Sequence, residues 1–127
     1  MYVDEHQRPL PGGTALGFGP IHQGIVAYFN GEQVILNTSF RHGRPVISRL
    51  EEFDGEVVRY VRPVPRTLEE SIRVERNAWS LLGEGAPWTI FNNCQDFVSR
   101  SYDGESGSQT RRLAGAGLVF GVLLALM

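Results

Sequence analysis

The sequence predicts one small α+β domain, in which an antiparallel sheet packs against helices and an apolar helix follows at the C-terminus. Short apolar runs rich in β-branched residues alternate with Gly-containing turns in the first half of the chain, which is typical of a sheet. The second half shows apolar residues at helical spacing behind capping residues. We assign residues 1–112 to the domain and residues 113–127 to the apolar helix, because 127 residues with 42% hydrophobic side chains suit one domain with a real core.

The composition excludes several classes of function. The net charge is -2 and the arginines are scattered, so no basic stripe follows a phosphate backbone and no nucleic-acid partner is expected. All 12 basic residues are arginine, which excludes a catalytic lysine. One cysteine forms no internal disulfide, and no Cys/His cluster suggests a metal, so we expect no cofactor. The N-terminus lacks the blocks of a signal peptide, so we expect a cytoplasmic or membrane-associated protein.

The strands are predicted from the apolar runs and the turns between them. Residues 7–19 carry many prolines and glycines and are expected to form an irregular leader. Asn30-Gly31 separates two apolar runs, residues 20–29 and 33–37, and therefore predicts a hairpin. After a loop over residues 38–44, further strands are predicted over residues 45–48 and 56–61, with a short turn at residues 50–53 between them. Together these strands form an antiparallel meander.

A helix is predicted to start after Thr67, because Thr67 and Glu70 have the spacing of a reciprocal capping box. Gly83 is its expected end. A connection over residues 85–87 and a short extended segment over residues 88–91 follow. The apolar face of this helix is predicted to comprise Leu68, Ile72, Ala78, Trp79, Leu81 and Leu82.

The only cysteine, Cys94, is predicted to lie in the first turn of the next helix. Asn92 and Asn93 precede it and are favoured caps, while Phe97 and Val98 continue at helical spacing. The free N–H groups and the helix dipole at this end favour an anion, so we expect a thiol shifted toward thiolate, as in a nucleophilic cysteine. A buried, inert cysteine is the alternative.

A nucleophilic cysteine needs a base, and the chain offers three histidines. His22 stands at the entry of a predicted strand, where its side chain emerges at the edge of the sheet, and it is the preferred base. His42 lies on the predicted loop and is the weaker candidate, and His6 is expected to be solvated in the leader.

The last fifteen residues, 113–127, are apolar without interruption. They are fewer than the roughly twenty residues that a bilayer-spanning helix needs, so a truncated span, a shallow anchor and a buried core helix all remain open. Arg111-Arg112 precedes the run, and Gly117 and Gly121 form a small-xxx-small pair within it. Membrane contact through residues 113–127 is the expectation.

The order of these elements, with histidine before cysteine, resembles the circularly permuted papain-like cysteine enzymes. It most closely resembles the lecithin retinol acyltransferase (LRAT) family, which belongs to the wider NlpC-type superfamily. The family motif Asn-Cys-x-x-Phe-Val is matched at residues 93–98, and a His-x-x-Ile-Tyr strand is similar to residues 22–26. Gly104 and the Ser-x-Gln-type segment at residues 106–109, followed by an apolar anchor, are further likenesses.

The resemblance implies roles for individual residues. Cys94 is the expected nucleophile, His22 its general base, and the Cys94 backbone N–H part of the oxyanion hole. The second histidine of the family is missing from residues 34–38, and Asn37 is expected to orient the imidazole instead, as asparagine does in papain-like sites.

The implied activity is that of a thiol acyltransferase or hydrolase that forms a thioacyl-enzyme, with a lipid acyl ester as the expected substrate. A peptidase or amidase of the same superfamily that cuts cell-wall peptides or an isopeptide bond is one alternative. A non-catalytic, membrane-anchored binding module is the other. The residues do not distinguish hydrolysis from transfer.

Overall fold

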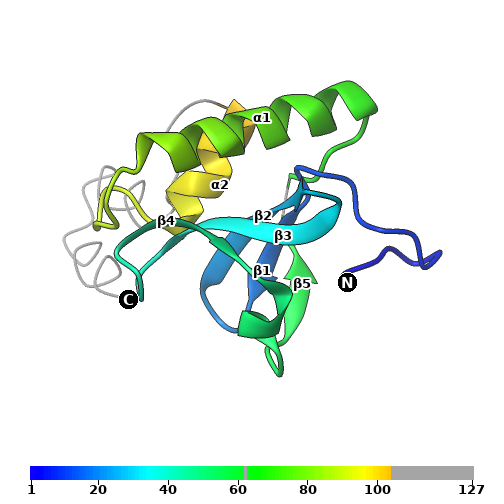
Figure 1. The fold of residues 1–127 in the computed structure, drawn as a ribbon, viewed down its shortest axis with the longest axis horizontal. Coiled ribbons are helices and arrows are strands. Elements are labelled where there is room, and N and C mark those ends of the chain that lie inside the picture. The colour runs from blue at the N-terminus through cyan, green and yellow to red at the C-terminus, as the bar shows by residue number, and fades with distance from the viewer. Residues whose placement is uncertain (62, 104–127) are drawn as a thin grey trace, which may run out of the picture.

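The computed structural model describes residues 1–61 and 63–103, which form an α+β domain (Figure 1). The predicted helix over residues 113–127 lies outside these residues. The elements follow the order β1 (Ala15–Phe18), β2 (His22–Phe29), β3 (Glu32–Ser39), β4 (Arg44–Ser48), the 3-10 turn η1 (Leu50–Phe53), β5 (Val58–Tyr60), α1 (Leu68–Glu84) and α2 (Cys94–Asp103).

The five strands form one antiparallel sheet in the order β4-β3-β2-β1-β5. The predicted hairpin is confirmed, since Asn30 and Gly31 connect β2 to β3 with φ values of 51° and 79°. Two predictions were wrong. The leader contains the buried strand β1, and the last strand, β5, pairs with β1 instead of β4, so the meander covers β1 to β4 only.

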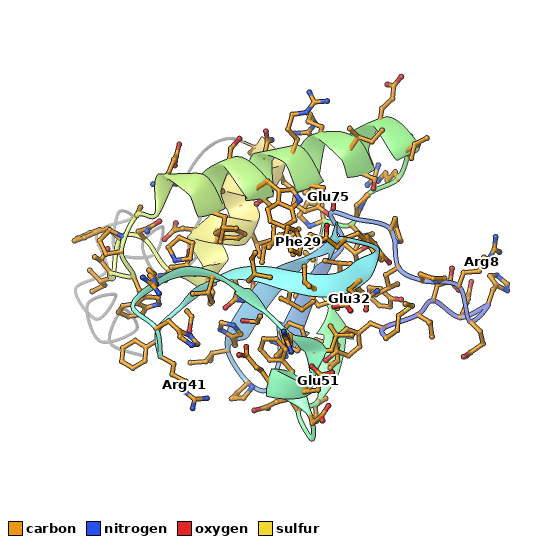
Figure 2. The ribbon with its side chains drawn as sticks, viewed as in Figure 1. Arg8, Phe29, Glu32, Arg41, Glu51 and Glu75 are labelled. Atoms are coloured by element: carbon orange, nitrogen blue, oxygen red, sulfur yellow. The ribbon has the colours of Figure 1, made fainter. Side chains whose placement is uncertain are left out.

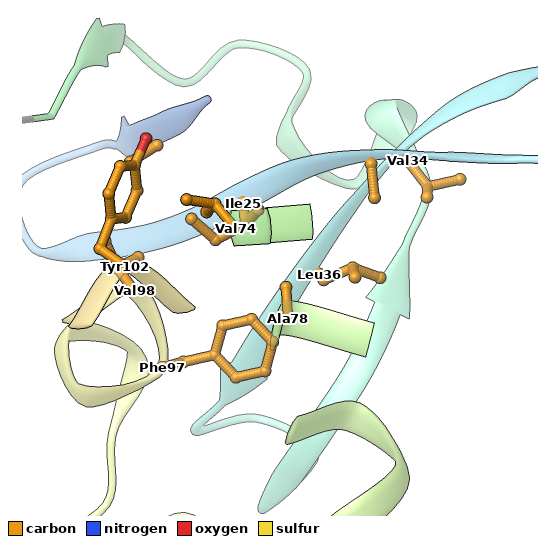
Figure 3. Packing of buried hydrophobic residues seen from close by; sticks show 10 residues of the cluster. Ile25, Val34, Leu36, Val74, Ala78, Phe97, Val98 and Tyr102 are labelled. Atoms are coloured by element: carbon orange, nitrogen blue, oxygen red, sulfur yellow. The ribbon is translucent and has the colours of Figure 1, made fainter. Parts of the chain in front are cut away.

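Both helices cover one face of the sheet (Figure 1). Their shared core contains Phe97 and Val98 from α2, Val74 and Ala78 from α1, and Ile25 from β2 (Figure 3). Burying each of the valine, isoleucine and phenylalanine side chains stabilises the fold by about 1.5–3 kcal/mol. A second, smaller core lies on the opposite face of the sheet and includes Leu16, Phe18, Val26 and Ile35.

The Thr67 cap of α1 is confirmed, because Glu70 N donates to Thr67 Oγ1 at 3.1 Å. The predicted reciprocal bond differs, since the Glu70 carboxylate accepts from the Arg66 N–H at 3.3 Å. The helix passes the predicted stop at Gly83 and ends at Gly85, whose φ of 65° is the left-handed conformation that glycine adopts without strain. The predicted apolar face is partly wrong. Leu68 and Ile72 are exposed, whereas Val74 is fully buried.

The segment before α2 is a tight turn instead of an extended strand. Thr89 and Asn92 exchange backbone hydrogen bonds of 2.8 and 3.0 Å. The Asn92 side chain donates to the carbonyl oxygens of Ala86 and Pro87, which ties the turn to the end of the α1–α2 connection. These hydrogen bonds fix the turn that leads directly into the helix starting at Cys94.

Among residues 1–61 and 63–103, none of the helices has the length and apolar character that crossing a bilayer requires.

Candidate active site

Cys94 is the first residue of α2, and a reciprocal pair of hydrogen bonds fixes its place there. The Asn93 side-chain oxygen accepts from the backbone N–H groups of Gln95 and Asp96 at 3.0 and 3.2 Å. The buried Asp96 carboxylate accepts in return from the Asn93 N–H at 3.1 Å. This is a capping box built from Asn and Asp, and it confirms that an asparagine caps the cysteine helix. The role of Asp96 was not recognised in the sequence, although the spacing of Asn93 and Asp96 signals it.

The body of α2 is anchored independently of its first turn. The Tyr102 hydroxyl donates to Gly13 O at 2.7 Å, and the Asn77 amide donates to Ser101 O at 2.9 Å. Together with the packing of Phe97 against the sheet, these bonds hold the helix at a fixed position over β2 and β3.

The Cys94 thiol reaches the entry of β2, where it donates to Ile21 O at 3.7 Å. The Gln23 backbone N–H also points at the sulfur and favours its thiolate form. Ile21 and Gln23 flank His22, so the sulfur lies within about 6.5 Å of the His22 Cα. Cys94 and Ile21 are 73 residues apart in the sequence. The structure thus brings the two predicted catalytic residues, Cys94 and His22, to the same end of β2.

The sheet is open at this point. Pairing of β2 with β3 begins at Ile25 and Leu36, so residues 22–24 pair with β1 alone. Val26 N donates toward the β1 side, to Thr14 O, and backbone groups alternate along an antiparallel strand. The N–H of Gln23 therefore points away from β1, into the gap, and the sulfur takes the place of a strand partner there.

Gly24 allows β3 to approach β2 just beyond this gap. A Cβ atom at position 24 would lie 2.4 Å from Ile35 Cγ2 and 3.2 Å from Leu36 O. Because Ile35 is fully buried, no other residue fits without moving β3.

The His22 side chain lies on the face of the sheet opposite the helices. It shares this face with Val26 and Phe18, and its ring lies 6.3 Å from the Phe18 ring and 5.8 Å from the stacked Phe53 ring. The half-buried imidazole is held by a hydrogen bond of 3.0 Å between Nε2 and Asn37 Oδ1. Asn37 thus contacts the residue that it was expected to orient.

The Asn37 amide has only one consistent orientation. Its Nδ2 donates to Ile35 O at 3.3 Å and to Ser48 Oγ at 3.0 Å, so its oxygen faces His22. An amide oxygen only accepts, and the proton of the neutral imidazole must therefore sit on Nε2. The lone pair of Nδ1 is left available to act as a base.

Both ionisable groups rest neutral. Burial lowers the pKa of His22 below its ordinary 6.5, against the opposite effects of the Asn37 hydrogen bond and the Glu56 carboxylate. Burial also raises the pKa of the Cys94 thiol, although the N–H groups of Gln23, Gln95 and Cys94 act in the other direction. The expected shift toward thiolate is wrong for the resting state, because desolvation outweighs the donors at the helix start.

In the described part of the chain, no hydrogen bond links the Cys94 thiol to the His22 ring. The thiol proton is directed at Ile21 O instead. Hydrogen bonds of catalytic pairs are often long or misaligned before substrate binds. Proton transfer to Nδ1 requires the thiol to turn from Ile21 O toward the imidazole.

A groove of about 290 Å³ adjoins His22 on its side of the sheet. Phe18 and Phe53 form apolar parts of its wall, and Arg41 and Glu56 are charged residues of its lining. Arg41 extends from the β3–β4 turn away from the helices (Figure 2). His42 also lines the groove, where its Nδ1 pairs with Ser39 Oγ at 2.9 Å, whereas the exposed His6 lies next to Glu5 in the N-terminal segment.

Exposed apolar side chains occur on the segments that form the candidate site. Ile21, whose carbonyl binds the sulfur, is 53% exposed, and Phe91, three residues before Cys94, is 64% exposed. The exposed Phe40 makes an edge contact with Trp88, with ring centroids 4.7 Å apart.

Comparisons with family models, with curated proteins and with solved structures found no match to this chain.

Proposed function

We propose that this chain is a cysteine acyltransferase or hydrolase of the LRAT-like type, with a circularly permuted papain-like fold and a lipid acyl ester as its substrate. One observation carries the proposal. The sulfur at the start of α2 lies against the backbone that flanks His22, and Asn37 holds that imidazole with Nδ1 unprotonated. A thiol, a base and an orienting amide are the parts that papain-like chemistry requires.

The first half-reaction follows from these roles. The thiol turns from Ile21 O toward His22 Nδ1, which takes its proton while the sulfur attacks the ester carbonyl. The Cys94 N–H, at the start of the helix, donates to the oxyanion of the tetrahedral intermediate. The intermediate collapses to a thioester, and the imidazolium gives its proton to the departing alcohol.

The second half-reaction regenerates the thiol. His22 removes a proton from water, or from an amine or alcohol acceptor, and the acceptor attacks the thioester. The acyl group leaves with the acceptor, and the sulfur recovers the proton from the imidazolium. Because both pKa shifts favour the neutral pair at rest, His22 acts as a general base during attack instead of forming a standing ion pair.

Exposed apolar side chains of the candidate site support a lipid substrate. The carbonyl of Ile21 binds the thiol, and Phe40 lines the groove beside His22. With Phe91, they would contact acyl chains or the membrane surface. The apolar sequence of residues 113–127 would keep the domain near such a surface.

The decisive test is covalent labelling by an acyl probe that reacts through a thioester. We expect Cys94→Ala to abolish labelling and His22→Ala to lower its rate at least a hundredfold, the lower range for loss of a general base. His42→Ala is the matched control, because it removes the other histidine of the groove and should keep the rate. Equal rates in the wild type and His22→Ala would refute the proposal.

The peptidase alternative is favoured by the charged lining of the groove, where Arg41, Glu52 and Glu56 suit a peptide better than an acyl chain. Liposomes and peptidoglycan fragments offered to the same preparation separate the two. Release of fatty acid or transfer of an acyl chain supports the lipid substrate. Release of peptides alone supports the peptidase.

The non-catalytic binding module is favoured by the protonated resting thiol. Alkylation by iodoacetamide does not separate it from the enzyme, because both predict a slow reaction at neutral pH. The dependence of acyl-probe labelling on His22 does separate them, since a binding module has no such dependence.

A further inference from the structure

We propose that Ser48, on β4, is a positioning residue whose hydroxyl holds the Asn37 amide with its oxygen toward His22 and so keeps the imidazole proton on Nε2. The use of the freed Nδ1 as a base rests on the proposed function. The effect of Ser48 on the His22 tautomer does not rest on the proposed function, because it follows from hydrogen bonds present without substrate.

The register of the sheet places Ser48 beside Asn37. Ile35 pairs with Ser48, and Asn37 pairs with Val46, so Ser48 and Asn37 are diagonal neighbours on one face of β3 and β4. The Ser48 Oγ accepts from Asn37 Nδ2 at 3.0 Å. Asn37 passes this constraint to His22 through its Oδ1, 3.0 Å from Nε2.

The inner end of this chain of bonds is buried at the base of the groove. Asn37 is 1% exposed and Ser48 is 3% exposed. An N–H donor that loses its partner at such a buried position pays a desolvation cost.

The two acceptors of the amide act together. Ile35 O and Ser48 Oγ each take one N–H of Nδ2. A flip would set the amide oxygen against Ile35 O, which only accepts, so Ile35 O selects the orientation. The Ser48 hydroxyl, which can bond to either end of an amide, holds the amide in place against His22. A flipped amide would also present N–H groups to Nε2, which then would have to carry the lone pair, with the proton on Nδ1. With its proton on Nδ1, the imidazole has no lone pair there to accept the thiol proton.

Ser48→Ala removes one of the two acceptors and leaves Ile35 O. We expect the imidazole to change from a single Nε2-protonated form to a mixture of both tautomers, read directly from the ¹⁵N shifts of the His22 ring. We also expect the His22 pKa to fall further in an NMR titration, because the Asn37 bond that raises it weakens. The rate of acyl-probe labelling should drop about three- to tenfold, as for one hydrogen bond.

Ser71→Ala is the matched control. Ser71 is also a buried serine whose hydroxyl donates to a backbone carbonyl, that of Gly12, but it lies on α1 and has no bond to Asn37 or His22. It should lose stability and keep the wild-type tautomer. If Ser48→Ala does not fold, Ser48→Cys, of similar size but a weaker acceptor, takes its place, and the tautomer and the His22 pKa are then the readouts, since the new thiol could itself be labelled.

A wild-type tautomer and an unchanged His22 pKa in the folded Ser48 variant would overturn the positioning role. The readout needs no turnover, so the two proposals fail separately. A protein that acylates nothing but shows mixed tautomers in Ser48→Ala, and not in Ser71→Ala, would refute the enzymatic function and support the role of Ser48.

Discussion

The Cys94 thiol donates to the carbonyl oxygen of Ile21 over 3.7 Å, at the point where β2 has lost its pairing with β3. The gap in the sheet gives the sulfur access to the backbone on both sides of His22. The thiol is protonated at rest because burial raises its pKa, and its proton is directed at Ile21 O. The same contact thus holds the sulfur beside His22, its proposed base, with the thiol proton turned away from the imidazole.

The acylation rate should depend on the protonation of His22. A protonated imidazole has no lone pair on Nδ1, so we expect the rate of acyl-probe labelling to fall as the pH drops through the His22 pKa. That pKa lies below 6.5 because the ring is buried, and the rate should therefore be level at neutral pH and decline only on the acid side. Labelling rates measured between about pH 5 and 8 test this expectation. A decline centred above 6.5 would contradict it.

Replacing Asn37 should affect both the rate and its pH dependence. Asn37→Ala removes the bond that orients the ring and raises its pKa, so we expect labelling to slow about tenfold and the acid decline to move to lower pH. Thr38→Ala, on the same strand and also buried, faces the helices and serves as the control for local repacking. Equal losses in both variants, with no shift of the acid decline, would show that Asn37 acts through folding alone.

Local signals in the sequence identified most of the fold. The Asn30-Gly31 turn, the Thr67 cap and the asparagines before Cys94 each depend on a few neighbouring residues, and the structure contains all three. Strand β1 was missed because its glycines resemble loop breakers. At Gly17 the Arg59 side chain lies over the strand, 2.8 Å from where a Cβ atom would stand, and that contact comes from the distant strand β5.

In the candidate site too, features set by neighbouring residues could be predicted, whereas contacts between distant residues could not. Cys94 and His22 were recognisable because each opens a predicted element, and Asn37 because it lies on the strand after His22. Ser48 was not, because its contact with Asn37 depends on the register of β3 against β4. The pKa of the thiol was expected in the wrong direction because the helix start is visible in the sequence, whereas the depth of burial is not.

Gly24→Ala should destabilise the protein where β3 approaches β2. The new methyl group would meet Ile35 Cγ2 at 2.4 Å and the Leu36 backbone at 3.2 Å, so we expect a loss of about 1–3 kcal/mol in the free energy of unfolding. Gly83→Ala is the control, because nothing lies within 4 Å of its added methyl group. That variant should gain up to about 1 kcal/mol as helix propensity improves. Denaturant unfolding measures both, and a neutral Gly24→Ala would show that β3 moves freely.

The capping box at Asn93 and Asp96 should matter for Cys94 reactivity as well as for stability. Asp96→Ala removes the carboxylate that holds the Asn93 N–H, and the first turn that carries Cys94 loses its anchor. We expect a loss of about 1–2 kcal/mol in the free energy of unfolding, together with slower acyl-probe labelling, because the sulfur no longer stays at the entry of β2.

Glu70→Ala tests the same kind of bond at the other helix. Glu70 accepts from the Arg66 N–H at the start of α1, on a largely exposed helix end far along the chain from Cys94. It should cost less stability and leave the labelling rate unchanged. If Asp96→Ala folds and labels at the wild-type rate, the capping box serves the helix alone, and the position of the sulfur must be held by the packing of Phe97 and Val98.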